Sequence, residues 1–438
     1  MSWAPRDLVH PLAPLAHGLS ALGQAAFDRR LQPRIAAPIA VAFSGGGDSL
    51  AALMATQAWA KRHHRRVVVL HVDHQLQASS GAWADRAMRV AAGLGLQGQV
   101  LPWLGDKPTT GIPAAARHAR HALIAEAARG HGARVVVFGH TADDQDEGDL
   151  MRAQGLGLGR LAQWRPSPVW PQGRGLFLLR PLLDERRAAL RQILAASGLD
   201  WIDDPANDDA RSPRIQARRR LTEGEAIARP PPQDFSDDPA LTTLARTARI
   251  CDGGAIVLRR DALVAAAEPV ARRLLAAALT CAAGAQAPPR RSAVVALLSR
   301  LRAPGAVQAT LDGARLSADP EIIVSREAGV FRRRAEPRAC LGRANSVVWD
   351  GRFELSTQAS DLFTVTPLAG RAKTLPLFQR SRLKALRPEV RAALPLVVDS
   401  AGAATCPILA TDEPVTAKSL IADRFFAFCG VISNESEI

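Results

Sequence analysis

The chain has 438 residues, which exceeds one ordinary hydrophobic core and favours two or three domains. It carries 56 Lys and Arg against 42 Asp and Glu, and this net charge of +14 favours a polyanionic partner such as a nucleic acid over a merely soluble basic protein. The five cysteines are widely spaced without a C-x-x-C pair, so they form no zinc or disulfide pattern and favour a reducing compartment. No apolar run reaches the length of a membrane span, and we therefore expect a cytoplasmic protein with no membrane association.

Apolar runs of strand length alternate with segments of helical spacing through the first 200 residues. Strands are predicted at 38–43, 67–74, 99–103, 134–140 and 176–183, and helices at 17–32, 50–63, 80–94, 113–129, 143–152 and 184–197. This alternation predicts a doubly wound parallel sheet of the α/β class, in which ligands bind beyond the carboxyl ends of the strands.

The second half of the chain differs in composition. A proline-rich linker at 229–240 separates an N-terminal domain (1–228) from a helical and hairpin domain (241–340) and a small α+β domain (341–438). The pattern predicts helices at 241–283, 291–301 and 387–394, strands at 353–355, 363–365 and 396–398, and a hairpin at 306–326. In that hairpin, Val307, Ala309 and Leu311 are expected to face Ile322 and Val324.

A glycine-rich loop follows the first predicted strand and opens the next helix. It consists of Ser44, Gly45, Gly46, Gly47, Asp48 and Ser49. Several backbone N–H groups and the positive end of a helix meet in such a loop, which favours a bound phosphate over a simple capped turn. No Gly-Lys-Ser or Gly-Lys-Thr occurs in the chain, so a Walker-type P-loop is not expected.

Further polar residues follow the other strand ends. His74 comes after the second strand, and His140, Asp143, Asp144 and Glu147 come after the fourth. The acidic residues could share a metal ion with Asp48, although acidic residues are also common in the first turn of a helix. Single histidines at such places are more often packed or capping residues than proton carriers.

The loop Ser-Gly-Gly-x-Asp-Ser at a strand end resembles the pyrophosphate loop of the N-type ATP pyrophosphatases, which split ATP into AMP and pyrophosphate. Within that superfamily the chain resembles the tRNA(Ile)-lysidine synthetase family. The resemblance spans residues 36–222 and is carried, in the family's order, by segments 71–76, 116–121, 141–147, 180–183 and 201–207, with Arg214 and Arg218.

The resemblance implies a fold like that of the adenine-nucleotide alpha hydrolases and a ligase that uses ATP and Mg²⁺. The wobble cytidine of isoleucine tRNA with a CAU anticodon would be adenylated, and L-lysine would then displace AMP to form lysidine, which changes codon reading from AUG to AUA. The implied catalytic residues are Asp48, Asp143, Asp144 and Glu147, with Asp48 and Asp144 as metal ligands. The implied nucleotide site adds Val72, His74, Arg117 and His140 to Ser44–Ser49, and the implied substrate site contains Asp203, Asn207, Arg214 and Arg218.

Some residues depart from the family pattern, namely Gln75, Gln77, Trp83, Gly148 and Gln216. These departures affect the expected contacts with the nucleotide and the tRNA more than the expected class of reaction. Two other functions stay open at this point: a related tRNA-modifying enzyme that transfers sulfur, and a non-catalytic RNA-binding module. The absence of cysteine before Cys251 argues against the first, and the intact glycine loop argues against the second. The sequence does not determine the oligomeric state, and a homodimer is one possibility.

Overall fold

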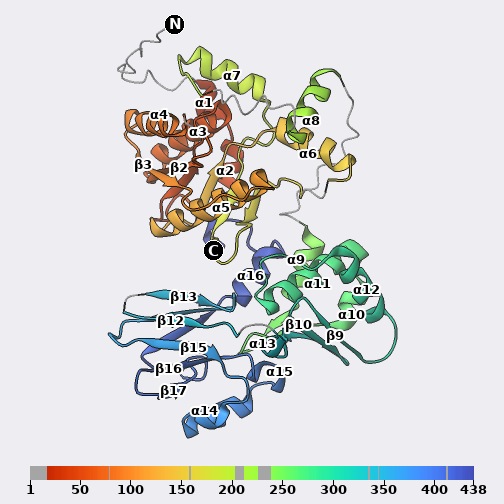
Figure 1. The fold of residues 1–438 in the computed structure, drawn as a ribbon. Helices are drawn as coiled ribbons and strands as arrows, with labels where there is room; N and C mark the ends of the chain where they lie inside the picture. The colour runs from red at the N-terminus through yellow and green to blue at the C-terminus, as the bar shows by residue number, and fades with distance from the viewer. Residues whose placement is uncertain are drawn as a thin grey trace. The chain divides into compact units, whose positions relative to one another are not determined.

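The computed structural model describes residues 17–77, 79–156, 159–202, 212–224, 238–333, 336–343, 345–410 and 413–438. The chain divides into two compact units, shown in Figure 1. The N-terminal unit is Met1–Ser236 together with Ile432–Ile438, and the C-terminal unit is Asp237–Val431. The further division of the second half near residue 340 stays a prediction.

A six-stranded sheet in the order β3-β2-β1-β4-β6-β5 forms the centre of the N-terminal unit. Five strands are parallel: β1 (Ile39–Ala42), β2 (Val67–Asp73), β3 (Gln97–Pro102), β4 (Val135–Phe138) and β6 (Phe177–Leu179). The edge strand β5 (Trp164–Pro166) runs antiparallel to β6 and was not predicted. The predicted α/β fold with a parallel sheet is confirmed.

Helices flank this sheet. The helices are α1 (His17–Ala21), α2 (Gln24–Arg30), α3 (Gly47–Arg62), α4 (Ser80–Gly93), α5 (Ile112–Gly130), α6 (Ala142–Ala153), α7 (Arg187–Ala196) and α8 (Pro213–Thr222). The helix that begins in the glycine loop, α3, packs against the three central strands β1, β2 and β4. The lead-in helix predicted at 17–32 is two helices, because Gly23 adopts a left-handed conformation with φ of 65° between them.

Both faces of the sheet are apolar, as a doubly covered parallel sheet requires. One face packs against α5 through a cluster that contains Ala40, Val68, Val136 and Ile124. The intervening strand residues, such as Val41 and Val137, are fully buried as well, and α3 packs against β1, β2 and β4. This burial fixes the strand ends, and therefore the loops that follow them.

The C-terminal unit contains three antiparallel sheets and several short helices. Its first part consists of α9 (Pro239–Arg246), β7 (Arg249–Ile250), β8 (Ile256–Leu258), α10 (Arg260–Ala265), α11 (Glu268–Ala283), α12 (Arg291–Arg302), β9 (Val307–Leu311), β10 (Ala314–Ala318), β11 (Ile322–Arg326) and α13 (Val330–Arg333). Its second part consists of β12 (Ala339–Leu341), β13 (Ser346–Trp349), β14 (Phe353–Thr357), β15 (Phe363–Pro367), α14 (Leu377–Ala385), α15 (Pro388–Arg391), β16 (Pro395–Val398), β17 (Ala404–Thr405), β18 (Val415–Ser419) and α16 (Ile421–Phe428).

The segment 241–283, expected to be mostly helical, contains α9, α10 and α11. The strands β7 and β8, which are joined through Gly253 and Gly254, both at positive φ, lie between α9 and α10 and were not predicted. One prediction for this unit is wrong. In the hairpin region, β9 pairs with β10, and β10 pairs with β11, so the residues around Val307 do not face Ile322 directly. The tight turn at Asp312–Gly313, also with positive φ, creates the intervening strand.

The last seven residues, 432–438, belong to the N-terminal unit. Within that unit the Arg65 guanidinium donates to both carboxylate oxygens of Glu435, at 2.8 and 3.0 Å, and both side chains are buried. The indole Nε1 of Trp164 donates to the carbonyl of Ile432 at 3.0 Å. The chain therefore returns to the unit from which it starts.

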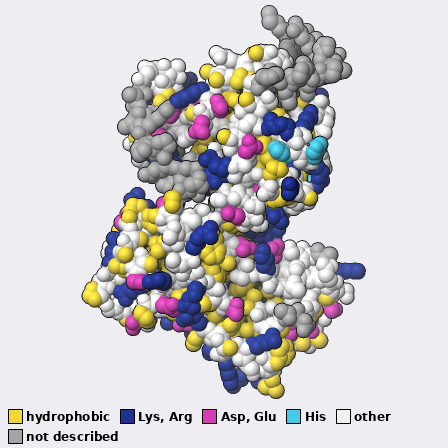
Figure 2. Space-filling view, turned by 180° about the vertical axis from the view of Figure 1, so that it is seen from behind, with side chains coloured by type: hydrophobic (Ala, Val, Ile, Leu, Met, Phe, Trp, Pro, Cys, Tyr) yellow, Lys and Arg dark blue, Asp and Glu magenta, His cyan; other side chains and the backbone are white. Residues whose placement is uncertain are grey.

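Basic side chains are scattered over the face of the molecule shown in Figure 2, in keeping with the net charge. Within the described residues, no helix combines the length and hydrophobicity needed to cross a lipid bilayer.

Candidate active site

The glycine loop connects β1 to α3, as predicted. Gly46 caps the helix with an extended backbone, and Gly45 has φ of 89°. The Ser49 hydroxyl donates to the Gly46 carbonyl at 2.8 Å, and the Ser44 hydroxyl donates to Ser49 Oγ at 3.1 Å. The loop is thus held in one conformation, with the amino end of a 16-residue helix beside it.

Two neighbouring segments approach this loop closely. A Cβ atom at Gly139, after β4, would lie 2.4 Å from the carbonyl oxygen of Asp48. On another side, the backbone N–H of Ile202 donates to the Gly45 carbonyl at 2.9 Å, and a Cβ atom at Gly45 would lie 2.6 Å from the Ile202 side chain. Glycine is required at both positions because of these contacts.

An arginine that the sequence analysis did not single out lies at the centre of the predicted acidic cluster. Arg187, at the start of α7, donates to Asp48 at 2.8 Å, to Glu147 at 3.1 Å and to Asp144 at 3.3 Å. Its backbone N–H donates to Asp143 Oδ2 at 2.8 Å. The four predicted catalytic carboxylates therefore meet around one residue.

Two further arginines from α8 complete this cluster. Arg214 donates to Glu147 at 2.8 Å and to Asp144 at 2.6 Å, and Arg218 donates to Glu147 at 2.8 Å. The side chain of Glu147 is only 1% exposed. Burial alone would raise the pKa of Glu147, but the hydrogen bonds from Arg218 and Arg214 hold it below its usual value, so the carboxylate is ionised.

Asp48 differs from its neighbours. Burial raises its pKa above the usual value, and the ion pair with Arg187 offsets this effect only in part. Its Oδ1 atom is buried and has no hydrogen-bond partner. Within the described residues, this oxygen is a candidate ligand for a cation.

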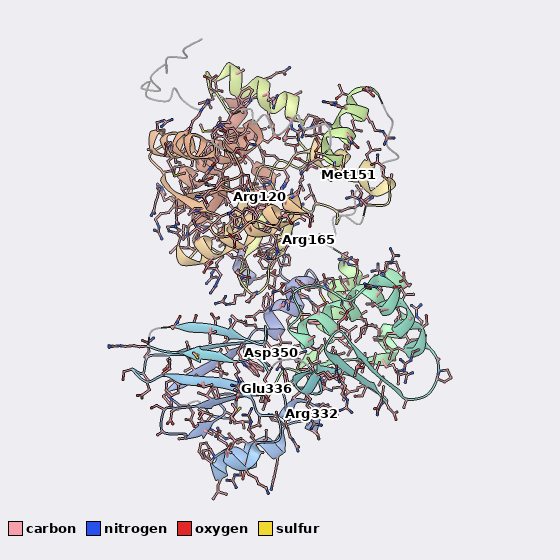
Figure 3. All side chains as sticks on the ribbon, viewed as in Figure 1. Arg120, Met151, Arg165, Arg332, Glu336 and Asp350 are labelled. Carbon is pink, nitrogen blue, oxygen red and sulfur yellow. The ribbon has the colours of Figure 1, made fainter. Side chains whose placement is uncertain are left out.

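A cavity of about 940 Å³ lies beside this cluster. Arg120 from α5, Met151 from α6 and Arg165 from β5 line it, and Figure 3 labels these three residues. Asp144 and Arg214 also line it, which connects the cavity to the acidic cluster. Its basic lining residues are Arg29, Arg117, Arg120, Arg152, Arg160, Arg165, Arg180 and Arg214, against Asp144, Asp149 and Asp184.

Two of these cations, Arg120 and Arg180, lie at partly or fully buried positions and have no ion-pair partner among the described residues. Burial and the neighbouring Arg117 lower the pKa of Arg120 to about 10, and its Nε atom has no hydrogen-bond partner. Burial and Arg165 lower the pKa of Arg180 to about 9. Uncompensated buried positive charge of this kind favours an anionic ligand such as a phosphate.

Two histidines in the cavity wall are neutral. Burial and Arg180 lower the pKa of His140 well below its usual value, and Arg180 Nε donates to His140 Nδ1 at 3.1 Å. The ring proton of His140 therefore resides on Nε2. Burial lowers the pKa of His121 to about 3. Both histidines contact the ring of Phe138: His140 is stacked on it, with ring centroids 5.8 Å apart, and His121 is tilted against it at 5.3 Å.

The predicted site residues thus fall into three groups. Ser44–Ser49 form the loop, and Asp143, Asp144, Glu147, Arg214 and Arg218 form the cluster with Asp48. His74, Arg117 and His140 line the cavity, whereas Val72 lies in β2 and is not part of its lining. Asp203 and Asn207 lie outside the described residues. Sequence reasoning missed Arg187 and Arg120, although the spacing of Arg117 and Arg120 on one helix face could have indicated the latter.

Comparisons with known proteins agree with this site. The PP-loop domain family matches residues 22–225. A tRNA(Ile)-lysidine synthase of Caulobacter vibrioides is 44% identical over 422 residues, which cover 94% of this chain and 98% of the relative. Another of Hyphomonas neptunium is 41% identical over 225 residues, which cover 50% of this chain and 58% of the relative.

Among solved structures, the U34-tRNA thiolase NcsA from Methanococcus maripaludis aligns with 47% of this chain and 78% of its own, at 12% identity and a TM-score of 0.34, which is too weak to carry an argument. The similarity to the Caulobacter relative, in contrast, extends over nearly the whole of both chains. On this evidence the chain belongs to the tRNA(Ile)-lysidine synthase family.

Proposed function

We propose that this protein uses ATP to attach lysine to the wobble cytidine of isoleucine tRNA with a CAU anticodon, and so forms lysidine. The observation that carries the proposal is the joint position of the glycine loop, the acidic cluster and the arginine-lined cavity at one edge of the sheet. The loop suits the phosphates of ATP, and the cavity suits an RNA segment with its phosphate groups. All five cysteines follow residue 250, which speaks against sulfur transfer by local thiols.

Magnesium fits the donor atoms that the cluster offers. Within the described residues, no three His, Cys, Asp or Glu side chains form a protein-only metal site. Mg²⁺ typically uses one or two carboxylates together with phosphate oxygens and water. Asp48, through its unpartnered Oδ1, and Asp144 would hold such an ion against the phosphates of ATP. When bound, it neutralises phosphate charge and makes pyrophosphate a better leaving group.

The arginine and carboxylate cluster suits a lysine substrate. Lysine carries a carboxylate and two amines, so its site needs both signs of charge in a confined space. Arg214 and Arg218, each more than a third exposed, can bind the lysine carboxylate, and the buried Glu147 holds both arginines in place. Asp144, which lines the cavity, supplies the negative charge for an ammonium group. The surrounding arginines favour the neutral form of the attacking amine, which is the nucleophilic form.

The test of the proposal is incorporation of labelled lysine into the tRNA by the purified full-length protein. We expect incorporation to require ATP and to release AMP and pyrophosphate. A tRNA with uridine in place of the wobble cytidine should accept no lysine. Incorporation without ATP, or into the uridine variant, would refute the proposal.

Replacing Asp48 should separate stability from activity. A carboxyl group whose pKa is raised by folding binds its proton more tightly in the folded state, so near neutral pH its ionised form costs stability. Asp48→Asn should therefore melt at the same or a higher temperature than the wild type, while pyrophosphate release falls at least about a hundredfold. Differential scanning fluorimetry and a pyrophosphate assay measure both. A clear fall in melting temperature would contradict this assignment.

Replacing Glu147 should weaken lysine use in particular. Glu147→Gln removes the negative charge that three arginines share, and we expect KM for lysine to rise at least about tenfold with a smaller change in KM for ATP. Asp146→Asn is the matched control, because Asp146 lies on the same helix and pairs with the exposed Arg186. An equal rise in both constants for Glu147→Gln would point to general damage and not to lysine binding.

A further inference from the structure

Arg187 contacts all four carboxylates of the acidic cluster, and none of the predicted roles accounts for it. Its guanidinium contacts Asp48, Asp144 and Glu147, while its backbone holds Asp143. The side chain is 16% exposed, so part of it is in contact with solvent.

The three carboxylates depend on Arg187 to different degrees. Glu147 also pairs with Arg214 and Arg218. Asp144 also pairs with Arg214, and its other oxygen accepts from the backbone N–H and the hydroxyl of Thr141. Within the described part of the chain, Asp48 has Arg187 as its ion-pair partner and no second one. Among the three carboxylates, Asp48 is therefore the one whose ion pairing depends on Arg187 alone within the described residues.

A cation bound between Asp48 and Asp144 would compete with Arg187 directly. Both would use the same two carboxylates, and like charges at a few ångströms repel strongly where water is excluded. A guanidinium that leaves the carboxylates finds a suitable partner in a phosphate, which it can bind with two parallel hydrogen bonds. Asp48 itself belongs to the glycine loop, where such phosphates would lie, and it is in the first turn of α3.

We propose that Arg187 is an exchangeable counter-ion: in the ligand-free protein it occupies the cation position at Asp48, and on binding of ATP with its divalent cation it transfers from Asp48 to the phosphates. Arg187 is thus a positioning residue that keeps Asp48 in place and limits binding of a free metal ion. This inference rests on the proposed use of ATP with a divalent cation.

The test measures Mn²⁺ binding to the nucleotide-free full-length protein by electron paramagnetic resonance. Arg187→Met removes the charge and keeps the aliphatic stem, and we expect it to bind Mn²⁺ at least about tenfold more tightly than the wild type. Arg186→Met is the matched control, since the neighbouring Arg186 pairs with Asp146 and does not contact Asp48. It should stay within about twofold of the wild type. Adding Asp48→Asn to Arg187→Met should abolish the gain.

The inference is overturned if Arg187→Met binds Mn²⁺ no better than the wild type, or if Arg186→Met gains as much. A second measurement follows the wild-type protein by nuclear magnetic resonance and uses a variant only to identify the signal. The side-chain Nε–H resonance of Arg187, identified by its loss in Arg187→Lys, should shift in the wild type when Mg²⁺ and a non-hydrolysable ATP analogue are added. An unchanged resonance would overturn the inference as well. Because nucleotide-free Mn²⁺ binding involves neither tRNA nor lysine, its outcome is independent of whether lysine ligation is observed.

Discussion

Gly139→Ala should abolish pyrophosphate release and destabilise the N-terminal unit by about 3 kcal/mol or more. A Cβ atom at this position would lie 2.4 Å from the carbonyl oxygen of Asp48, 2.7 Å from its carbonyl carbon and 2.8 Å from Cα of Ser49. All three atoms belong to the backbone of the first turn of α3, so no side chain can move aside to make room. The end of β4 and the start of α3 would have to separate, and the glycine loop would lose its conformation.

The matched control for this substitution is Gly81→Ala. Gly81 is exposed on α4, and a Cβ atom there would meet nothing within 4 Å. Alanine in a helix is favoured over glycine by about 0.5–1 kcal/mol, so this variant should be slightly more stable than the wild type. Denaturant unfolding and the pyrophosphate assay distinguish the two variants. A Gly139→Ala protein with wild-type stability and pyrophosphate release would show that the close approach of β4 to α3 is unimportant.

The sequence was sufficient to locate the loop and the strand ends, because both depend on local patterns. The runs around Val41, Val69 and Val137 are apolar throughout, as buried parallel strands require, and glycine at the strand end marks the phosphate loop. The carboxylates Asp143, Asp144 and Glu147 follow a strand end and were identified for the same reason, but Arg187 was missed. The resemblance of the chain to a known family supplied the roles that local pattern alone could not.

The sequence could not predict the pairing of charges across long separations. Arg187 and Asp48 are 139 residues apart, and an arginine at the start of a helix looks like any exposed cation. The edge strand β5 contains only three residues, too few to show a periodicity. In the C-terminal unit, Gly253 and Gly254 interrupt a composition that is otherwise helical. The short strands on either side of them, β7 and β8, pair with each other, and β8 also pairs with the distant strand β11.

Local sequence patterns also could not predict that residues 432–438 return to the N-terminal unit. This segment is the basis of the second prediction with a large expected effect. Glu435→Gln should reduce the free energy of unfolding of this unit by about 3–5 kcal/mol. The side chain of Glu435 is fully buried and that of Arg65 is 2% exposed, so the substitution leaves a guanidinium in the interior without its carboxylate. Arg65 also donates to the carbonyls of Ala37 and Gln32, and these bonds keep it from turning outward to water.

Glu126→Gln provides the matched control for this prediction. It is the same chemical change in the same unit, at an exposed position on α5, and should alter stability by less than about 0.5 kcal/mol. Thermal unfolding of both variants, followed by tryptophan fluorescence, measures the difference. Because Glu435 touches neither the glycine loop nor the acidic cluster, Glu435→Gln should keep its affinity for ATP at temperatures where it remains folded. Unchanged stability in Glu435→Gln would mean that the segment 432–438 contributes little to the unit, whereas lost ATP affinity in the folded variant would mean that it also shapes the site.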